Sequence, residues 1–187
     1  MTKTQDNLQA LKIVERLKTI QRASPVNDRQ ESTSEHSFHA VLIADMLTDQ
    51  YPPGVDVQRV KDLVLYHDLV EVHAGDVALT DTKARKNKEK EEYEAFKQLI
   101  TEIPNPQRYT KLYEEYEKRE TIEAKIAKKI DRIEVLVNAV NESRIVKQQG
   151  YSEEFLRKHY DNIGGDVPVI DKLHEEILSE LKTQGKI

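Results

Sequence analysis

Apolar residues recur every three or four positions along most of this chain, and charged residues fill the positions between them. Such spacing forms one apolar face on a helix, whereas a half-buried strand requires strict alternation of apolar and polar residues. The first stripe consists of Leu8, Leu11, Val14, Leu17 and Ile20. No segment alternates over enough residues to predict a strand. The spacing therefore predicts an all-α fold.

Proline, glycine and polar clusters divide the chain into helices joined by short connections. One expected loop covers positions 72–82, with Gly75 as its bend, and Ser34 is the expected N-cap of the second helix. The residues of that helix expected to point inward are Phe38, Val41, Leu42 and Leu47. The expected helices cover about residues 8–20, 34–50, 57–68, 83–103, 112–116, 121–146, 152–160 and 167–181.

Length and composition limit the classes of protein that remain. A chain of 187 residues can bury one core of its own, so we expect a single domain over residues 1–187. The formal net charge of −5 argues against non-specific binding to nucleic acid. Cysteine is absent, which excludes disulfides and thiolate chemistry. Neither a signal peptide nor a membrane-spanning stretch is evident, and we expect a soluble, cytoplasmic protein.

The pair His67-Asp68 is the strongest chemical signal in the chain. It ends an apolar-periodic helix, and two further ligand-type residues, His36 and Asp131, each lie inside another amphipathic helix. Imidazole nitrogens and carboxylate oxygens together suit a divalent first-row metal and can leave coordination positions for water and substrate. The sequence therefore predicts a hydrolytic metal centre.

Glu71 and Asp131 have the surroundings that such a centre requires. Glu71 follows Asp68 by three positions, so on a helix it lies one turn further along the same face. A carboxylate there can orient or deprotonate a water molecule without binding the metal itself. Asp131 lies among isoleucines and a valine, where an unpaired carboxylate is costly. Taken alone, a residue such as Glu71 is usually a solvated charge, and Asp131 could pair with nearby Lys128 or Arg132.

Three segments extend the pattern beyond single residues: RQESTSEHS at 29–37, YHDLVEV with a later GD at 66–76, and EAK with KKID at 123–131. In this order the segments resemble the signature of the HD superfamily of metal-dependent phosphohydrolases, in the branch that contains the 5'-deoxynucleotidases. The combination spans about residues 22–145 and is far more specific than an isolated His-Asp pair.

The resemblance implies an HD-type helical bundle with its core in about residues 8–146 and C-terminal helices at 152–183 packed on that core. It implies one divalent ion bound by four residues, His36, His67, Asp68 and Asp131. Glu71 would be the catalytic carboxylate that acts on the attacking water, and Asp76 a second active-site carboxylate near the sugar. Arg22 matches the arginine that meets the substrate phosphate. The resemblance also implies a homodimer.

Several details stay open at this point. Lys128 lies three residues before Asp131 and is either its partner or a contact for the phosphate. Well-known bacterial members have an aromatic residue after the arginine, whereas this chain has Ala23, so ribose and deoxyribose both remain candidate sugars. Mn, Co, Ni, Fe, Zn and Mg all tolerate ligands of these types to different extents, and spacing does not choose among them.

The remaining charged and histidine residues have structural interpretations. We expect residues 83–94 to form an exposed, ion-paired helix face, with Lys83 or Arg85 as a less favoured phosphate contact. We expect His39 to pack against a neighbouring helix and His73 to lie near the site or on the surface. His159 and His174 are expected to be solvated.

The function that fits these residues is metal-dependent hydrolysis of nucleoside or deoxynucleoside 5'-monophosphates, with a small phosphorylated substrate and no nucleic-acid or membrane partner. An HD hydrolase of another phosphorylated signal, such as an alarmone or a cyclic nucleotide, is the alternative enzyme. Alarmone hydrolases have a Glu-Asp pair shortly after the HD pair, but here Val72 follows Glu71. A helical binding protein with a structural metal and no activity is the third possibility.

Overall fold

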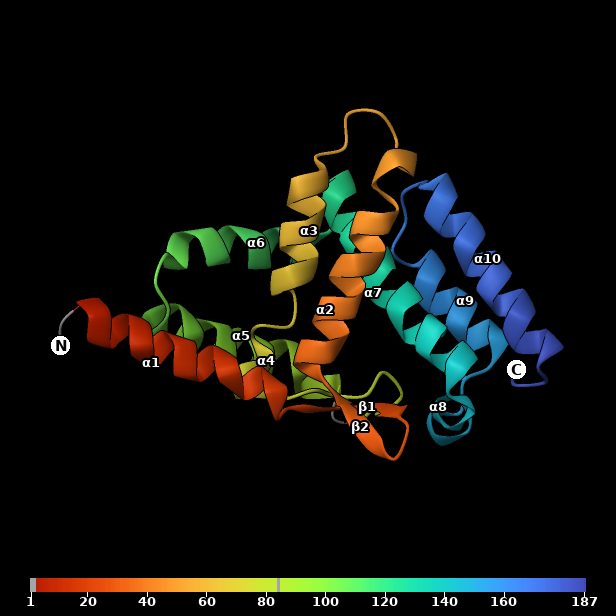
Figure 1. Ribbon diagram of the computed structural model, residues 1–187, viewed down its shortest axis with the longest axis horizontal. Helices are drawn as coiled ribbons and strands as arrows, with labels where there is room; N and C mark the ends of the chain where they lie inside the picture. Colours follow the sequence, from red (N-terminus) through yellow and green to blue (C-terminus); the bar gives the residue numbers. More distant parts are fainter. Residues whose placement is uncertain (1–2, 84) are drawn as a thin grey trace.

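The apolar periodicity is realised as α-helices over residues 3–83 and 85–187, the part of the chain that this computed structural model describes (Figure 1). The helices are α1 (Lys3–Glu15), α2 (Thr33–Met46), α3 (Val57–Tyr66), α4 (Glu71–Ala74), α5 (Arg85–Glu102), α6 (Pro106–Lys118), α7 (Ile122–Asn141), α8 (Ser143–Gln149), α9 (Glu153–Asp161) and α10 (Pro168–Thr183). Short 3-10 turns cover Arg16–Lys18 and Thr48–Gln50. The all-α prediction is confirmed, with one small hairpin as the exception.

The hairpin consists of β1 (Gln21–Val26) and β2 (Arg29–Ser32), which pair antiparallel directly before α2. The sequence analysis missed it. The strands are short and their pairing is irregular between Gln21 and Pro25, so the sequence lacks the alternation that identifies a strand. Asn27 makes the turn with a φ of 51°, a conformation that asparagine adopts more readily than most residues.

The second helix begins two residues earlier than expected. Ser32, and not Ser34, is the N-cap of α2. Its side chain accepts a hydrogen bond from the backbone N–H of Glu35, and the Glu35 carboxylate accepts one from the backbone N–H of Ser32 at 2.9 Å. This reciprocal pair is a capping box, which requires a glutamate three residues after the serine. Ser32 meets that requirement, because Glu35 follows it at this spacing.

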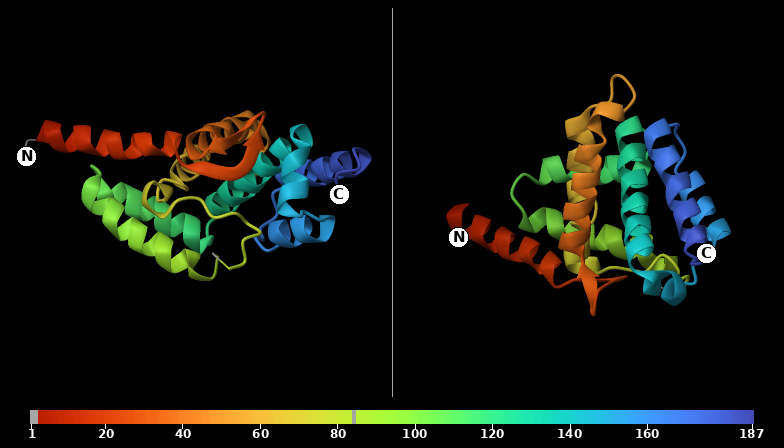
Figure 2. Two further views of the ribbon diagram at one scale, coloured as in Figure 1. Left: turned by 90° about the horizontal axis from the view of Figure 1, so that it is seen from below. Right: turned by 45° about the vertical axis from the view of Figure 1, so that its right-hand side comes forward.

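The main core forms around α7, which contacts α2, α3, α6 and α10. Figure 2 shows α2, α7 and α10 side by side in its right-hand view. Buried aliphatic residues of α3, α7 and α10 form much of this core, including Val60, Leu63, Val64, Ile126, Ile130, Ile133, Ile170, Leu178 and Leu181. Burying aliphatic side chains of this size is the main favourable contribution to folding. Residues on the inner face of α7 are therefore held in fixed positions.

A second, smaller cluster lies among α1, α4, α5 and α6. Its buried residues include Ile13, Val72, Phe96, Leu99 and Tyr109. Aromatic rings fill much of it, and the rings of Phe96 and Tyr113 stack with their centroids 4.3 Å apart. This cluster fixes α4 and α5 beside the main core, so the two clusters together border the site described below.

Two apolar stripes that the sequence predicts as buried are exposed in part. On α1 the buried positions are Ala10 and Ile13, whereas the predicted positions Leu8, Leu11 and Val14 face solvent. Figures 1 and 2 show α1 extending from one end of the molecule, where little of its surface has a partner. On α2 the predicted inward positions Val41 and Leu47 pack on the core, but Phe38 and Leu42 are exposed.

Further boundaries also differ from those expected. The helix predicted over 121–146 ends at Asn141, because Glu142 leaves helical geometry with φ −116° and ψ 95°, and α8 follows. The expected loop at 72–82 starts with the single turn of α4, after which Gly75 bends the chain at φ 73° as predicted. The helix expected from position 83 is described from Arg85, and position 84 lies outside the described residues.

None of the helices in the described part of the chain combines the length and the apolarity that crossing a bilayer requires.

Candidate functional site

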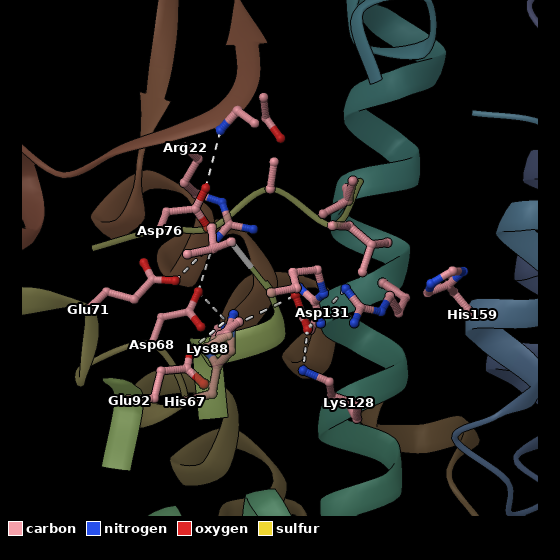
Figure 3. Close-up of a pocket in the computed structure, with 18 of the residues that line it drawn as sticks. Arg22, His67, Asp68, Glu71, Asp76, Lys88, Glu92, Lys128, Asp131 and His159 are labelled. Atoms are coloured by element: carbon pink, nitrogen blue, oxygen red, sulfur yellow. Dashed lines mark hydrogen bonds and ion pairs between the residues drawn. The ribbon is translucent and has the colours of Figure 1, made fainter. Parts of the chain in front are cut away.

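All of the predicted site residues except His36 line one cavity of about 240 Å³ between the core helix α7 and the smaller cluster (Figure 3). His36 is fully buried and lies directly behind His67 and Asp131. His36 comes from α2, Asp131 from α7, and His67 and Asp68 directly follow α3. Residues of β1, α4 and α5 complete its walls. These residues, which are far apart in the sequence, come together because α2, α3 and α7 pack on one another.

Ligand-type atoms of four residues converge at the base of this cavity. The Nε2 atom of His36 lies 3.3 Å from Nε2 of His67 and 3.3 Å from Oδ1 of Asp131. The Oδ2 atom of Asp68 lies 3.0 Å from Nε2 of His67 and 3.7 Å from Nε2 of His36. Bonds of about 2.1 Å to one ion place neighbouring ligand atoms roughly 3.0 to 3.4 Å apart. The donor set and its separations therefore fit one divalent ion.

Two adjacent residues can both face this point because α3 ends there. Its last helical residue is Tyr66, and His67 is the C-cap. The chain then turns, with the backbone N–H of Glu71 donating to the carbonyl of Asp68 at 3.0 Å, before α4 begins. On a continuing helix His67 and Asp68 would point about 100° apart. The helix end that the sequence analysis required is present.

Hydrogen bonds on the far side of each imidazole fix the direction of its Nε2 atom. His67 donates from Nδ1 to the carbonyl of Val64 at 2.7 Å. His36 donates from Nδ1 to Oε2 of Glu134 at 2.5 Å. Such bonds set the tautomer and ring orientation of metal-binding histidines. In both residues Nε2 is left facing the cavity.

Glu134 is a buried residue of the site that the sequence analysis missed. Its second oxygen, Oε1, accepts a hydrogen bond from Nδ1 of His39 at 2.9 Å. His39, whose side chain is 45% exposed, therefore contacts the site through Glu134. Glu31, His36 and Glu134 also bring ligand-type atoms close together behind the main site. The available signal was the spacing: Glu134 follows Asp131 by three positions and therefore lies on the same face of α7.

Glu71 borders the cavity as a nearly inaccessible carboxyl group. Its Oε2 atom accepts a hydrogen bond from the hydroxyl of Thr33 at 2.7 Å, and its Oε1 atom lies 4.0 Å from Nη1 of Arg22. Burial, followed by the charge of Asp68, raises the pKa of Glu71 well above its ordinary value. A carboxylate with a raised pKa is a stronger base, as proton transfer from water requires. Sequence reasoning did not find Thr33.

Arg22 reaches the cavity from β1 and lies among carboxylates. Its Nη1 atom is 2.9 Å from Oδ2 of Asp68 and 3.7 Å from Oδ1 of Asp76, and its Nε atom is 3.6 Å from Glu31. Burial opposes its charge, but Asp68 and Glu71 raise the pKa of Arg22, which stays protonated. Asp76 also accepts a hydrogen bond from the backbone N–H of Ala23 at 3.3 Å, which ties the hairpin to the loop after α4.

Lys128 contacts the candidate ligand Asp131 directly. Its Nζ atom donates to Oδ2 of Asp131 at 3.0 Å and to the hydroxyl of Tyr116 at 3.0 Å. Burial lowers the pKa of Lys128, although Asp131 opposes the shift. Of the two roles left open by the sequence, the structure shows the contact with Asp131. Because the outer oxygen of Asp131 pairs with Lys128, its Oδ1 atom faces His36.

The charged run at 83–94 contributes to the site, contrary to expectation. Lys83 is exposed and lies outside the cavity, whereas Arg85, Lys88 and Glu92 line it. Lys88 and Glu92 form an ion pair there, with Nζ and Oε1 3.0 Å apart. The prediction of a wholly solvated face is therefore wrong for one side of α5.

Two histidines that line the cavity away from the candidate metal ligands also differ in part from expectation. His174 is 1% exposed and stacks on Tyr160 with ring centroids 3.8 Å apart, so it is not solvated. Its position three or four residues from buried Ile170, Ile177 and Leu178 was the sequence signal for burial. His159 is half-buried at the far end of the cavity in Figure 3.

Comparison with known proteins adds to this geometry. The family described as HD domain matches residues 14–178. Human 5'-deoxynucleotidase HDDC2 is 31% identical over 183 residues, which cover 94% of this chain and 86% of that protein. The yeast 5'-deoxynucleotidase YGK1 is 31% identical over 136 residues, covering 68% of this chain and 62% of that protein.

The fold is shared with a solved structure as well. The crystal structure described as a predicted metal-dependent phosphohydrolase from Magnetospirillum magnetotacticum superposes with a TM-score of 0.87 at 27% identity, covering 100% of this chain and 98% of that one. The matched region includes the converging residues from His36 to Asp131. The chain therefore belongs to the HD-domain family.

Proposed function

We propose that this HD-domain protein is a metal-dependent 5'-nucleotidase, which hydrolyses nucleoside and deoxynucleoside 5'-monophosphates to a nucleoside and inorganic phosphate. The observation that carries the proposal is a cluster of three ligand-type residues that Asp131 also contacts. Beside it lie a buried carboxyl group, Glu71, and a buried guanidinium, Arg22. A purely structural metal site needs neither group. The names of the relatives support a nucleotide as the substrate.

The ion would be held by His36, His67, Asp68 and Asp131. When bound, it supplies a Lewis acid that lowers the pKa of water and offsets charge on the phosphoryl oxygens. Imidazole nitrogens favour transition ions over Mg²⁺, which prefers oxygen ligands, so we propose a first-row transition ion. Lys128 keeps the outer oxygen of Asp131 occupied and thereby directs the inner one toward His36.

Glu71 is the proposed base. Thr33 holds one of its oxygens, so the other is available to accept a proton from the attacking water. The water oxygen forms a new bond to phosphorus while the bond from phosphorus to the 5'-oxygen of the sugar breaks in line. The 5'-oxygen takes a proton from solvent and leaves as an alcohol, and Glu71 returns to solvent the proton that it accepted. Arg22 binds phosphoryl oxygens, for which the two-pronged geometry of a guanidinium is suited.

The sugar would lie near Asp76. This carboxylate lines the cavity next to Arg22, where it can accept a hydrogen bond from a sugar hydroxyl. Ala23 lines the same part of the cavity with a methyl group. Because so small a side chain restricts the sugar little, we propose that ribose and deoxyribose are both accepted.

The test is release of inorganic phosphate from a panel of ribo- and deoxyribonucleoside 5'-monophosphates. Protein stripped with a chelator would receive divalent ions one at a time, with the Asp131→Ala variant as the control for metal dependence. We expect release with at least one transition ion and none from the variant. If the wild-type protein releases no phosphate from any nucleotide with any ion, the proposal is wrong.

We further propose that the protein acts in the cytoplasm as a homodimer, with residues 1–187 as one folding unit. Nucleoside monophosphates are intracellular metabolites, which supports the location. An exposed apolar stripe on α2, formed by Phe38, Leu42 and Met46 at four-residue steps, supports the dimer, because large apolar patches seldom stay uncovered. Phe38 is 65% exposed and Met46 80% exposed.

The dimer proposal is tested by sedimentation of the wild-type protein and of Phe38→Glu. We expect a dimer from the wild type and a folded monomer from the variant, because a charge in a buried apolar interface is costly. Asp45→Lys, on an adjacent exposed position of α2, is the control for a general effect of altered surface charge. A monomeric wild-type protein at high concentration contradicts the dimer.

A further inference from the structure

We propose that Lys88, which Glu92 holds inside the cavity, is a second cationic contact for the phosphoryl group of the substrate, in addition to Arg22. The inference rests on the proposed phosphohydrolase function and names a residue that acts within it. In the view of Figure 3, Arg22 and Asp76 lie on one side of Asp68, and Lys88 and Glu92 lie on the other. A phosphoryl group beside Asp68 would therefore meet cations from two directions.

Lys88 lies on the face of α5 that turns toward the interior of the protein. In the C-terminal half of α5, Ala95, Phe96 and Leu99 are buried in the smaller cluster. Continuing that face toward the N-terminus at steps of three or four residues gives Glu92 and Lys88. The inward face of α5 thus changes from apolar residues to charged ones at the point where it reaches the cavity.

Neighbouring lysines show that this position is not an ordinary surface charge. Lys86 and Lys90 are exposed and do not line the cavity. The side chain of Lys88 is 23% exposed, and that of its partner Glu92 is 15% exposed. Removing an ion pair from water has an energetic cost that its mutual attraction often fails to recover. Stability alone therefore gives little reason to place this pair inside the cavity.

The charge of Lys88 is retained there. Burial opposes it, but Glu92, and beyond it Asp68 and Glu71, raise the pKa of Lys88. The same acidic residues would repel an incoming phosphate, which carries negative charge itself. A lysine held in their field offsets this repulsion, and it remains protonated at the pH where the substrate is a dianion.

Lys88 has hydrogen-bond capacity that the other cations of the site have already used in part. Arg22 lies within 4.0 Å of Glu31, Asp68, Glu71 and Asp76. Lys128 donates to Asp131 and to Tyr116. Among the described residues, the carboxylate paired with Lys88 is that of Glu92. An ammonium group has three N–H donors, so Lys88 can hold Glu92 and still donate to phosphoryl oxygens.

The same contact would act on the reaction. Negative charge on the phosphoryl oxygens must be offset as the bond to the leaving oxygen breaks, and fixed cations in a closed site do this effectively. We therefore expect Lys88 to contribute both to binding of phosphate and to kcat/KM. Hydrogen bonds to charged groups are strong enough that removing this one should weaken phosphate binding by about tenfold or more.

The test uses inorganic phosphate as the probe, measured by calorimetric titration into metal-loaded full-length protein. Lys88→Met removes the charge and keeps the bulk, Lys88→Arg keeps the charge, and Lys86→Met and Lys90→Met are matched controls on exposed positions of the same helix. We expect about a tenfold or greater loss of phosphate affinity in Lys88→Met, partial retention in Lys88→Arg and wild-type affinity in both controls. Metal content should stay at the wild-type level in every variant.

The proposal is overturned if Lys88→Met retains wild-type phosphate affinity and kcat/KM while it remains folded. Should Lys88→Met fold poorly, Lys88→Gln provides the same comparison with a polar replacement. A wild-type protein that binds phosphate through Lys88 but hydrolyses no nucleotide would contradict the nucleotidase function and leave this inference standing. If Lys88→Met hydrolyses nucleotides at the wild-type rate, the nucleotidase function stands and the role of Lys88 is wrong.

Discussion

Glu134 accepts a hydrogen bond from Nδ1 of His36 at 2.5 Å, and both side chains are almost fully buried. The bond joins the core helix α7 to α2 and leaves Nε2 of His36 facing His67 and Asp131. Burial opposes its charge, but hydrogen bonds with His36 and His39 lower the pKa of Glu134 to about 2. A charged carboxylate behind a histidine makes the other ring nitrogen a better metal ligand.

Replacing Glu134 by glutamine should therefore weaken metal binding. We expect the affinity to fall by about 10- to 100-fold, as is common when the partner of a metal-binding histidine loses its charge. Titration with the divalent ion, followed by calorimetry, measures the change directly. His39→Gln is the matched control, because His39 contacts the other oxygen of Glu134 and should have a smaller effect. An unchanged dissociation constant in Glu134→Gln would rule out the role assigned to this hydrogen bond.

Replacing Glu71 by alanine and replacing Asp68 by alanine should have different effects on metal content and turnover. Glu71→Ala should retain the metal and lose turnover by about 10²- to 10⁴-fold, since a positioned base contributes roughly that much. Asp68→Ala should lose both, because its Oδ2 atom lies among the ligand atoms. Metal analysis of purified protein together with phosphate release separates the two outcomes. Wild-type turnover in Glu71→Ala would show that another group accepts the proton.

Removing the metal should lower the thermal stability of the fold. The ion would bind the folded chain, in which the four residues converge, and not the unfolded one. At a free ion concentration about 100 times the dissociation constant, such binding adds about 2.7 kcal/mol to the free energy of unfolding. Calorimetric melting with added ion and with chelator measures the difference. The shift should vanish in Asp131→Ala, and a shift that persists there would point to ion binding elsewhere.

The stability of the protein should depend on pH through His174. Burial lowers the pKa of His174 below its ordinary value of 6.5, with Glu175 opposing the shift. Protonation would place a charge on this buried ring, whose Nε2 atom has no hydrogen-bond partner among the described residues. The unfolded chain therefore binds a proton at higher pH than the folded one, so this contribution to stability is lost as the pH falls below about 6.5.

Denaturant unfolding of the wild type and of His174→Gln at pH 7.5 and pH 5.5 measures this effect. Other groups titrate over the same interval, so the comparison lies in the difference between the two proteins. We expect the free energy of unfolding to fall more between these pH values in the wild type than in the variant. Equal losses in both proteins would show that His174 is not responsible.

The sequence was sufficient where the signal is local. Helical periodicity predicted most of the helices because a repeat of 3.6 residues is visible within a single segment. Gly75 was predicted as a bend and adopts a positive φ. The order of His36, His67, Asp68 and Asp131, together with the resemblance of the segments around them to the HD signature, was enough to predict that their side chains meet. The spacing of the capping box, a serine at 32 and a glutamate at 35, is also visible in the sequence, although Ser34 was the predicted N-cap.

Contacts between distant segments account for what the sequence did not predict. The hairpin is too short and irregular to show alternation, and its first strand packs on the distant helices α7 and α8. Thr33 and Glu134 look like ordinary polar residues in the sequence. Folding brings Thr33 of α2 to Glu71 of α4, and Glu134 of α7 to His36 of α2. Lys88 lies in a run of charged residues that places polar side chains on every face of the helix, so the sequence does not show which face turns inward.

By itself, therefore, the sequence determined the helical class, the ligand-type residues and their order along the chain. Which face of each helix turns inward was decided by tertiary packing, as Lys88 on α5 and the exposed Leu8 and Leu11 on α1 show. The physical reason is that periodicity identifies a helix face but not its neighbour. A charge or an apolar side chain acquires its role only from the groups that folding places against it.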